Sequence, residues 1–186
     1  FQVRRGQQMN NYVLIGFMGC GKTTIGRELA GKTGMEQLDT DALIVEKAGM
    51  PVTEIFHKEG EQGFRLRETE LLKELTSNGR ENVIYSTGGG IVLQEENREL
   101  LRRLGTVILL EITPDEVIRR LGKDTTRPLL QGPDRMKKVR TLMARRRQAY
   151  EDCADIRVAV SGKKPAEIAA EILCAVENKK TDREQK

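Results

Sequence analysis

Segments of strand length alternate along the chain with longer segments in which apolar residues recur every three or four positions. Strands are predicted at 12–15, 35–38, 82–86, 106–112 and 156–160, and the run at 106–112 is apolar enough to be buried on both faces. Helices are predicted at 22–32, 42–48, 52–58, 61–76, 95–104, 114–121, 134–152 and 165–176. This alternation predicts an α/β fold with a parallel sheet covered on both faces, and with ligands at the carboxyl ends of its strands.

Residues that favour helix ends lie at the boundaries of these segments. Gly34 is a good stop for the first helix, and Thr113, Pro114 and Asp115 form a typical helix start. Residues 122–134 contain glycines, prolines and charges without any period, so they are predicted to form a mobile loop.

Length and composition describe one domain. With 186 residues, of which 38% are hydrophobic and 32% charged, the chain is long enough to bury a substantial core. It contains no run of about 18 apolar residues and no signal-peptide pattern, so we expect a cytoplasmic protein without a membrane partner. Cys20, Cys153 and Cys174 have no metal-ligand spacing, which argues against a disulfide framework and a zinc site.

The net charge of +4 belongs to the two ends of the chain. Residues 1–8 and residues 179–186 each have a net charge of +2, which leaves none for residues 9–178. A nucleic-acid partner would need a basic face, and this distribution argues against one. We expect residues 1–8 to be foreign sequence ahead of a natural start at Met9, residues 9–178 to be a single domain, and residues 179–186 to be a flexible tail.

A phosphate-binding motif directly follows the first predicted strand. Residues 16–23 read Gly-Phe-Met-Gly-Cys-Gly-Lys-Thr and fit G-x-x-x-x-G-K-[ST] between a strand and a helix. The glycines let backbone N–H groups point inward, and the start of the next helix adds its partial positive charge. The motif therefore predicts a bound nucleoside triphosphate, with Lys22 on its β- and γ-phosphates and the Thr23 hydroxyl on Mg²⁺.

Two aspartates follow the second predicted strand. Asp39 and Asp41 are two residues apart, so in extended chain their side chains can share one side. One division of roles places Asp39 in the Mg²⁺ shell and lets Asp41 accept a hydrogen bond or proton from the hydroxyl to be phosphorylated. The alternative is that Asp41 or Thr40 only caps the following helix.

Gly88, Gly89 and Gly90 follow the third predicted strand at the same edge of the sheet. They either allow a close approach of the backbone to a ligand or form only a tight turn. Their predicted place opposite the phosphate-binding loop favours a role in substrate binding.

Several arginines fall where a charge needs a partner. In the helix at 134–152, Arg146 and Arg147 lie at the margins of the apolar face, where an arginine either extends to solvent or meets an anion. Helical geometry does not choose between the two. Arg65 has Glu68 three residues further on, so an ordinary intrahelical pair is its alternative role. Arg120 and Arg127 flank the predicted loop, where most arginines are solvated.

Taken together, these segments resemble the shikimate kinase family over about residues 9–176. The resemblance rests on G-F-M-G-x-G-K-[ST]-T-I-G-R at 16–27, Asp39-Thr40-Asp41, Phe64-Arg65-x-x-Glu68, residues 88–90, Arg127-Pro128-Leu129-Leu130, and Met143-Ala144-Arg145-Arg146 followed by Tyr150. It implies a three-layer αβα P-loop kinase fold with a five-stranded parallel sheet, a shikimate-binding helical segment at about 40–76 and a mobile lid at about 122–134. It also implies transfer of the γ-phosphoryl group of ATP, with Mg²⁺, to the 3-hydroxyl of shikimate in aromatic amino-acid biosynthesis.

The resemblance assigns roles to single residues as well. Nucleotide binding falls to Gly19, Cys20, Gly21, Lys22, Thr23, Thr24, Arg120, Arg127 and Lys163, and metal binding to Thr23 and Asp39. Shikimate binding falls to Asp41, Arg65, Gly88, Gly89, Gly90 and Arg146, so the family pattern selects Arg146 over Arg147. Asp41, Lys22 and Arg127 are the implied catalytic residues, with Arg127 reaching the transferring phosphoryl group from the lid.

Two residues of the loop depart from the family. Cys20 stands where the family usually has a small residue such as Ala, and Thr23 replaces the commoner Ser, which leaves a hydroxyl for the metal. A thiol beside a helix N-terminus and Lys22 is predicted to be reactive, so that oxidants or alkylating agents would inactivate the enzyme.

Other functions fit the motifs less completely. A gluconate kinase of the same fold would keep the loop but would not need two arginines for a carboxylate, and a GTPase would need an N-K-x-D-like segment, which we do not find. A shikimate-binding module without activity stays compatible with the pattern, although no motif residue is missing. We expect a monomer, because no surplus apolar surface helix is evident.

Overall fold

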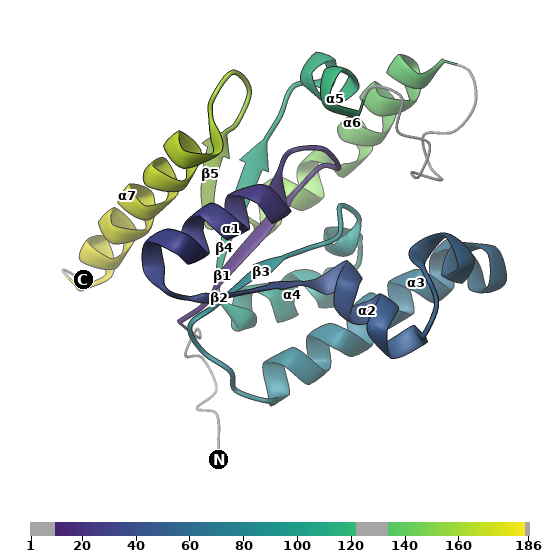
Figure 1. Cartoon of the computed structure of the whole chain (residues 1–186), viewed down its shortest axis with the longest axis horizontal. Coiled ribbons are helices and arrows are strands. Elements are labelled where there is room, and N and C mark those ends of the chain that lie inside the picture. Colours follow the sequence, from purple (N-terminus) through teal and green to yellow (C-terminus); the bar gives the residue numbers. More distant parts are fainter. Residues whose placement is uncertain (1–9, 122–133, 185–186) are drawn as a thin grey trace.

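The computed structural model describes residues 10–121 and 134–184, and its strands form a single parallel sheet (Figure 1). The strands are β1 (Tyr12–Gly16), β2 (Glu36–Asp39), β3 (Val83–Ser86), β4 (Thr106–Glu111) and β5 (Ile156–Ala159). Their order across the sheet is β2-β3-β1-β4-β5. The predicted α/β fold with a five-stranded parallel sheet is confirmed.

Helices cover both faces of the sheet. On one face α1 (Lys22–Thr33) packs beside α7 (Pro165–Glu184), and on the other α3 (Val52–Ser77), α4 (Glu95–Leu104) and α6 (Arg135–Cys153) lie together. Two shorter helices extend these layers, since α2 (Thr40–Ala48) packs on α3 and α5 (Pro114–Leu121) on α6. A short 3-10 helix, η1 (Ile91–Leu93), precedes α4 and is an element that the apolar pattern did not predict.

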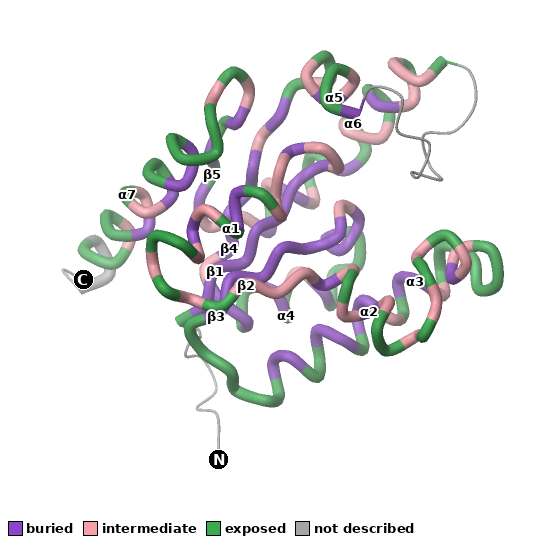
Figure 2. The backbone as a smooth tube through the Cα atoms, in the orientation of Figure 1, coloured by how far each residue is buried: buried purple, intermediate pink, exposed green. Residues whose placement is uncertain are grey.

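The core lies between these layers, along the central strands (Figure 2). Every residue of β1 is buried, and so are residues 107–110 of β4, as the continuous apolar run predicted. The edge strand β2 is only half-buried, which explains its weaker apolar pattern.

Helix α3 contains the break that the sequence indicates between residues 58 and 61. Gly60 has φ 72° and ψ −177° there, a conformation that a residue with a side chain rarely adopts, and the two helical segments meet at this kink. The kink allows the chain to change direction between these two helical segments.

Some predicted bounds are wrong. Helix α7 continues to Glu184, so residues 179–184 are helical and do not form the predicted tail. The predicted lid at 122–134 lies almost wholly outside the described residues, as do residues 1–8. No helix in the described ranges has the length and apolar character needed to cross a membrane.

Candidate active site

A cavity of about 710 Å³ opens at the carboxyl ends of the strands. Its walls come from the loop after β1, the start of α2, the first half of α3, residues 87–90 after β3, and α6. The parallel sheet thus brings segments from distant parts of the chain to one place.

The phosphate-binding loop is shaped by its glycines and by Lys22. Gly19 and Gly21 have φ angles of 79° and 96°, which favour glycine. Gly21 is also the N-cap of α1, so no capping side chain covers the first N–H groups of that helix. The Lys22 ammonium donates to the carbonyls of Gly16 at 2.8 Å and Phe17 at 3.1 Å. A positive charge and a helix N-terminus therefore meet in this loop, as phosphate binding requires.

Asp39 links the phosphate-binding loop to α2. One of its carboxylate oxygens accepts the Thr23 hydroxyl at 2.9 Å, and the other accepts the backbone N–H groups of Asp41 at 3.0 Å and Ala42 at 3.2 Å. The cap of this helix is therefore Asp39, and the alternative that Asp41 or Thr40 caps it is wrong. Asp41 stands in the first helical turn, not in extended chain, yet both carboxylates line the cavity.

Two of the three consecutive glycines at 88–90 approach charged side chains closely. A Cβ atom on Gly88 would lie 2.6 Å from Oδ1 of Asp41 and 2.9 Å from Oε1 of Glu68. A Cβ atom on Gly90 would overlap the guanidinium of Arg65. A side chain at either position would therefore displace charged groups of the site, which is more than a tight turn would involve.

Arg65 and Glu68 form a buried ion pair on α3. Arg65 donates to Glu68 at 2.6 Å and to Glu61 at 3.0 Å, and the side chain of Glu68 has no exposed surface. Burial raises the pKa of Glu68 to about 7, against the opposing effect of Arg65 and with a further increase from the nearby Asp41. The intrahelical pair that was the alternative role of Arg65 is thus present, and Arg65 also lines the cavity.

Helix α6 places Arg146 in the cavity and Arg147 outside it. Arg146 is 3% exposed, and it donates to the carbonyl of Gly89 at 3.2 Å. Its guanidinium carbon lies 5.8 Å from the centre of the Phe17 ring in the phosphate-binding loop. The Arg147 side chain is 76% exposed and pairs with Glu151 at 2.9 Å. Arg146 is therefore the arginine of this pair that can meet an anion in the cavity.

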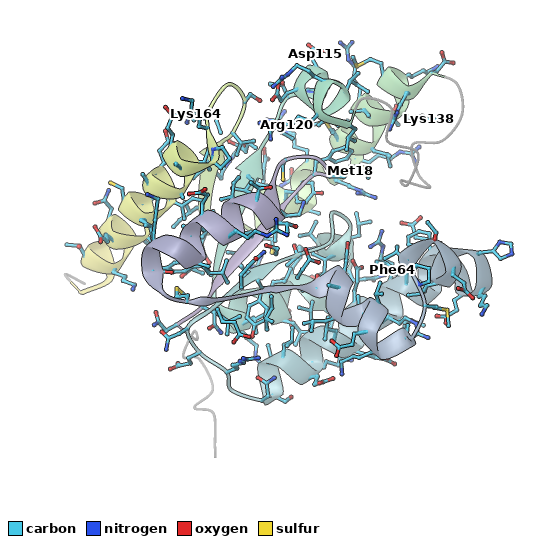
Figure 3. All side chains as sticks on the ribbon, in the orientation of Figure 1. Met18, Phe64, Asp115, Arg120, Lys138 and Lys164 are labelled. Carbon is cyan, nitrogen blue, oxygen red and sulfur yellow. The ribbon has the colours of Figure 1, made fainter. Side chains whose placement is uncertain are left out.

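A second cavity, of about 430 Å³, lies on the other side of the phosphate-binding loop. Arg120 of α5 and Lys163 line it together with Gly19, Gly21 and Thr24, which also line the first cavity. Arg120 lies beside the loop (Figure 3), with Nη1 3.4 Å from the carbonyl oxygen of Gly19. Most residues predicted to bind the nucleotide thus line one or both of these cavities, namely Gly19, Gly21, Lys22, Thr23, Thr24, Arg120 and Lys163.

Two predicted site residues are not placed in these cavities. Arg127 lies outside the described residues. Cys20 has no exposed surface, and its thiol lies 3.5 Å from the Lys22 ammonium inside the loop. This burial argues against easy access of an alkylating agent to the sulfur, and the reactivity of Cys20 stays a prediction.

An apolar wall of the cavity was not predicted. Val52, Phe56 and Phe64 line it from α3, and the two phenylalanine rings lie 5.0 Å apart. Met18 lines it from the phosphate-binding loop, and Figure 3 labels Met18 and Phe64 on these two elements. The family resemblance implied a substrate-binding segment at about 40–76, which includes this wall. Helical periodicity did not identify the wall itself, because an apolar face that contacts the core has the same pattern as one that contacts a ligand.

These features define a class of enzyme. A phosphate-binding loop, three carboxylates and two arginines surround one cavity at the carboxyl edge of a parallel sheet. The fold and the site are those of a P-loop kinase that phosphorylates a small anionic molecule.

Comparison with known proteins identifies the family within this class. The family model for shikimate kinase matches residues 18–177. A shikimate kinase of Enterococcus faecalis is 45% identical over 166 residues, which cover 89% of this chain and 97% of that protein. The structure of a shikimate kinase from Acinetobacter baumannii in complex with shikimate has a TM-score of 0.87 at 40% identity, and covers 92% of this chain and 95% of its own. The chain belongs to the shikimate kinase family.

A more distant structural match supports the fold alone. A gluconokinase of Sinorhizobium meliloti has a TM-score of 0.56 at 17% identity. The protein therefore shares the P-loop kinase fold with enzymes for other acceptors, and the acceptor depends on the residues of the cavity.

Proposed function

We propose that the protein transfers the γ-phosphoryl group of ATP to the 3-hydroxyl of shikimate, which produces shikimate 3-phosphate and ADP for aromatic amino-acid biosynthesis. The observation that supports this most directly is the shared cavity, in which Lys22 of the phosphate-binding loop lies with Arg65, Arg146 and Asp41. An acceptor with a carboxylate and hydroxyl groups matches two guanidiniums and a carboxylate.

The nucleotide half consists of the phosphate-binding loop and the second cavity. The loop N–H groups and Lys22 bind the β- and γ-phosphates. Arg120 and Lys163 line the second cavity, and we assign them to the adenine side of the nucleotide from the family pattern. Arg127 is the residue we assign to the transferring phosphoryl group, because its position in the family pattern is that of the lid arginine.

Mg²⁺ fits the oxygen atoms beside the loop. The Thr23 hydroxyl and the Asp39 carboxylate lie 2.9 Å apart, and both are hard oxygen ligands of the kind that Mg²⁺ takes together with phosphate oxygens and water. When bound, the ion neutralises charge on the phosphates. Within the described ranges no three acidic, histidine or cysteine side chains gather to hold a metal, which suits an ion that is bound mainly by the nucleotide.

The acceptor half holds the second substrate. Arg146 and Arg65 bind its carboxylate, and Asp41 accepts a hydrogen bond or proton from the attacking hydroxyl. The apolar wall with Phe56 and Phe64 covers the carbon ring. Most of the rate then comes from alignment of the two substrates and from neutralisation of charge, because phosphoryl transfer needs little covalent participation by the protein.

The cellular setting is also part of the proposal. The protein acts as a cytoplasmic monomer without nucleic-acid or membrane partners. The absence of net charge over residues 9–178 supports only the part of this that concerns nucleic acid.

A coupled assay of ADP release tests the function. With ATP and Mg²⁺, shikimate is expected to support turnover, whereas gluconate and AMP are not. Turnover with gluconate or AMP, and none with shikimate, would contradict the proposal. Shikimate 3-phosphate identified by mass spectrometry would establish the product.

A further inference from the structure

Tyr150 reaches the same carbonyl group as Arg146. It lies one turn further along α6, and its hydroxyl donates to the carbonyl of Gly89, which also accepts Nη1 of Arg146 at 3.2 Å. A carbonyl oxygen has two lone pairs, so both are used. Tyr150 is buried, and burial raises its pKa far above the ordinary value, so the hydroxyl remains a donor at any physiological pH.

The Gly89 carbonyl stands at the centre of the acceptor half. Before it, Thr87 is fixed to the carbonyl of Leu14 by its N–H at 3.2 Å and its hydroxyl at 2.9 Å. After it, Gly90 accepts the N–H of Leu93 at 3.1 Å. Between these anchors the N–H of Gly88 donates to the Thr40 hydroxyl at 3.3 Å, and the Gly88 carbonyl accepts the N–H of Ile91 at 3.3 Å. The carbonyl of Gly89 is held from α6.

A shift of this loop would disturb the other side chains of the acceptor half. Gly88 lies against Asp41 and Glu68, and Gly90 lies against Arg65, with no room for even a methyl group at either glycine. The position of the Gly89 carbonyl therefore determines how these charged groups are arranged around an acceptor.

The two donors to this carbonyl differ in one respect. Arg146 has a positive charge that an acceptor carboxylate attracts, and a guanidinium that turns toward that carboxylate loses its geometry with Gly89. Tyr150 is neutral, and its ring is fixed by burial, so its bond is retained. We propose that Tyr150 is a positioning residue that holds the Gly89 carbonyl while Arg146 binds the acceptor carboxylate. This inference rests on the proposed function.

Loss of the hydroxyl would leave Arg146 as the remaining side chain that donates to the Gly89 carbonyl among the described residues. The acceptor carboxylate and the Gly89 carbonyl would then compete for one guanidinium, which weakens acceptor binding. The phosphate-binding loop has its own bonds, from Lys22 to Gly16 and from Thr23 to Asp39, so nucleotide binding is spared.

The variant Tyr150→Phe tests this because it keeps the ring and removes only the oxygen. We expect the KM for shikimate to rise about five- to tenfold, as for the loss of one buried hydrogen bond, and the KM for ATP to change less than about twofold. Tyr85→Phe is the matched control. Tyr85 is buried in β3, and its hydroxyl has no hydrogen-bond partner among the described residues, so both KM values are expected to stay at those of the wild type.

A second readout does not depend on the acceptor. In the full-length protein without ligands, amide hydrogen exchange at residues 88–93 is expected to be faster in Tyr150→Phe than in the wild type, and unchanged in Tyr85→Phe. The inference would be overturned if Tyr150→Phe had the amide exchange at residues 88–93 and the KM for shikimate of the wild type. It would also be overturned if the variant lost thermal stability or kcat without a change in that KM. If the wild type does not phosphorylate shikimate, the proposed function fails, and the exchange rates still decide whether Tyr150 holds the loop.

Discussion

The two neighbouring arginines of α6 differ in how far they are buried. Arg146 is 3% exposed inside the cavity, whereas the Arg147 side chain is 76% exposed and is already paired with Glu151. A buried guanidinium that meets a carboxylate contributes far more to binding than an exposed ion pair does.

We therefore predict opposite outcomes for two alanine variants. Arg146→Ala should raise the KM for shikimate by about 10- to 100-fold, the effect of one charge-assisted hydrogen bond, with a small change in the KM for ATP. Arg147→Ala should leave both constants within about twofold of the wild type, because its pair with Glu151 is exposed. Steady-state kinetics with each substrate varied in turn measures both, and similar losses in the two variants would show that burial does not decide the role.

The three cysteines should differ in their reaction with an alkylating agent. Cys20 and Cys153 are buried, and burial raises the pKa of Cys153 to about 11, whereas Cys174 is exposed on α7. Iodoacetamide is expected to modify Cys174 first, with full retention of kinase activity. Mass spectrometry of the labelled peptides, followed in parallel with activity, checks this. Rapid labelling of Cys20 with loss of activity would contradict this and would support the reactive thiol predicted from the sequence.

Motifs and the family resemblance together predicted most of the charged side chains that line the cavity, whereas spacing alone left Arg146 and Arg147 open and did not predict the apolar wall. The motif glycines, Lys22, Asp39 and Asp41 follow directly after strands, and parallel strands all end at one edge. Side-chain environment was less predictable. The burial of Cys20 and the cap role of Asp39 depend on contacts with residues that are distant in the sequence or one helical turn away, and no periodicity reports those contacts.

At the level of elements, one side chain ties together the starts of three strands. Asn11 precedes β1, donates to the carbonyls of Arg80 at 2.8 Å and Leu104 at 2.9 Å, and accepts the N–H of Val83 at 2.9 Å. These bonds lie at the amino ends of β1, β3 and β4, at the opposite edge of the sheet from the cavity.

Asn11→Ala is therefore expected to reduce stability without affecting catalysis. The loss of these bonds, with backbone groups left unpaired in a buried position, should lower the free energy of unfolding by about 2–4 kcal/mol, while kcat and both KM values at 25 °C stay unchanged. Asn10→Ala is the control, because its side chain makes an exposed bond to Asn82, and it should cost less than about 0.5 kcal/mol. Urea unfolding of the three proteins measures the difference, and equal stabilities would contradict the role of Asn11.

The elements themselves were predicted well wherever periodicity was long or an end signal was strong. The start of α5 after Thr113 and the end of α1 at Gly34 agree with their signals. The short helix η1 was not predicted, because three residues provide too little periodicity. Leu93, the last residue of η1, is exposed.

At the scale of the whole molecule, Glu68 belongs to the candidate active site and also affects the stability of the fold. This carboxylate has no exposed surface, and it is surrounded by Arg65 on its own helix, Arg146 of α6, and Asp41 of α2. Its Oε1 atom has no hydrogen-bond partner among the described residues. A site for an anionic acceptor thus places a carboxylate where water cannot solvate it, which costs free energy whenever that group is ionised.

Glu68 should therefore make the stability of the protein depend on pH. Its pKa is about 7 in the folded state and near the ordinary 4.5 in the unfolded state, so folding takes up a proton between these values. The contribution to stability is fully present below pH 4.5, and it is lost as the pH rises through 7. Relative to Glu68→Gln, which cannot ionise, the free energy of unfolding of the wild type should fall by up to about 3 kcal/mol between pH 5 and pH 8.

Glu59→Gln serves as the control on the same helix. Arg67 lowers the pKa of Glu59, so the contribution of Glu59 to stability does not change over this pH range. Urea unfolding at several pH values measures the difference, and a constant gap between wild type and Glu68→Gln would mean that Arg65 keeps this carboxylate ionised throughout.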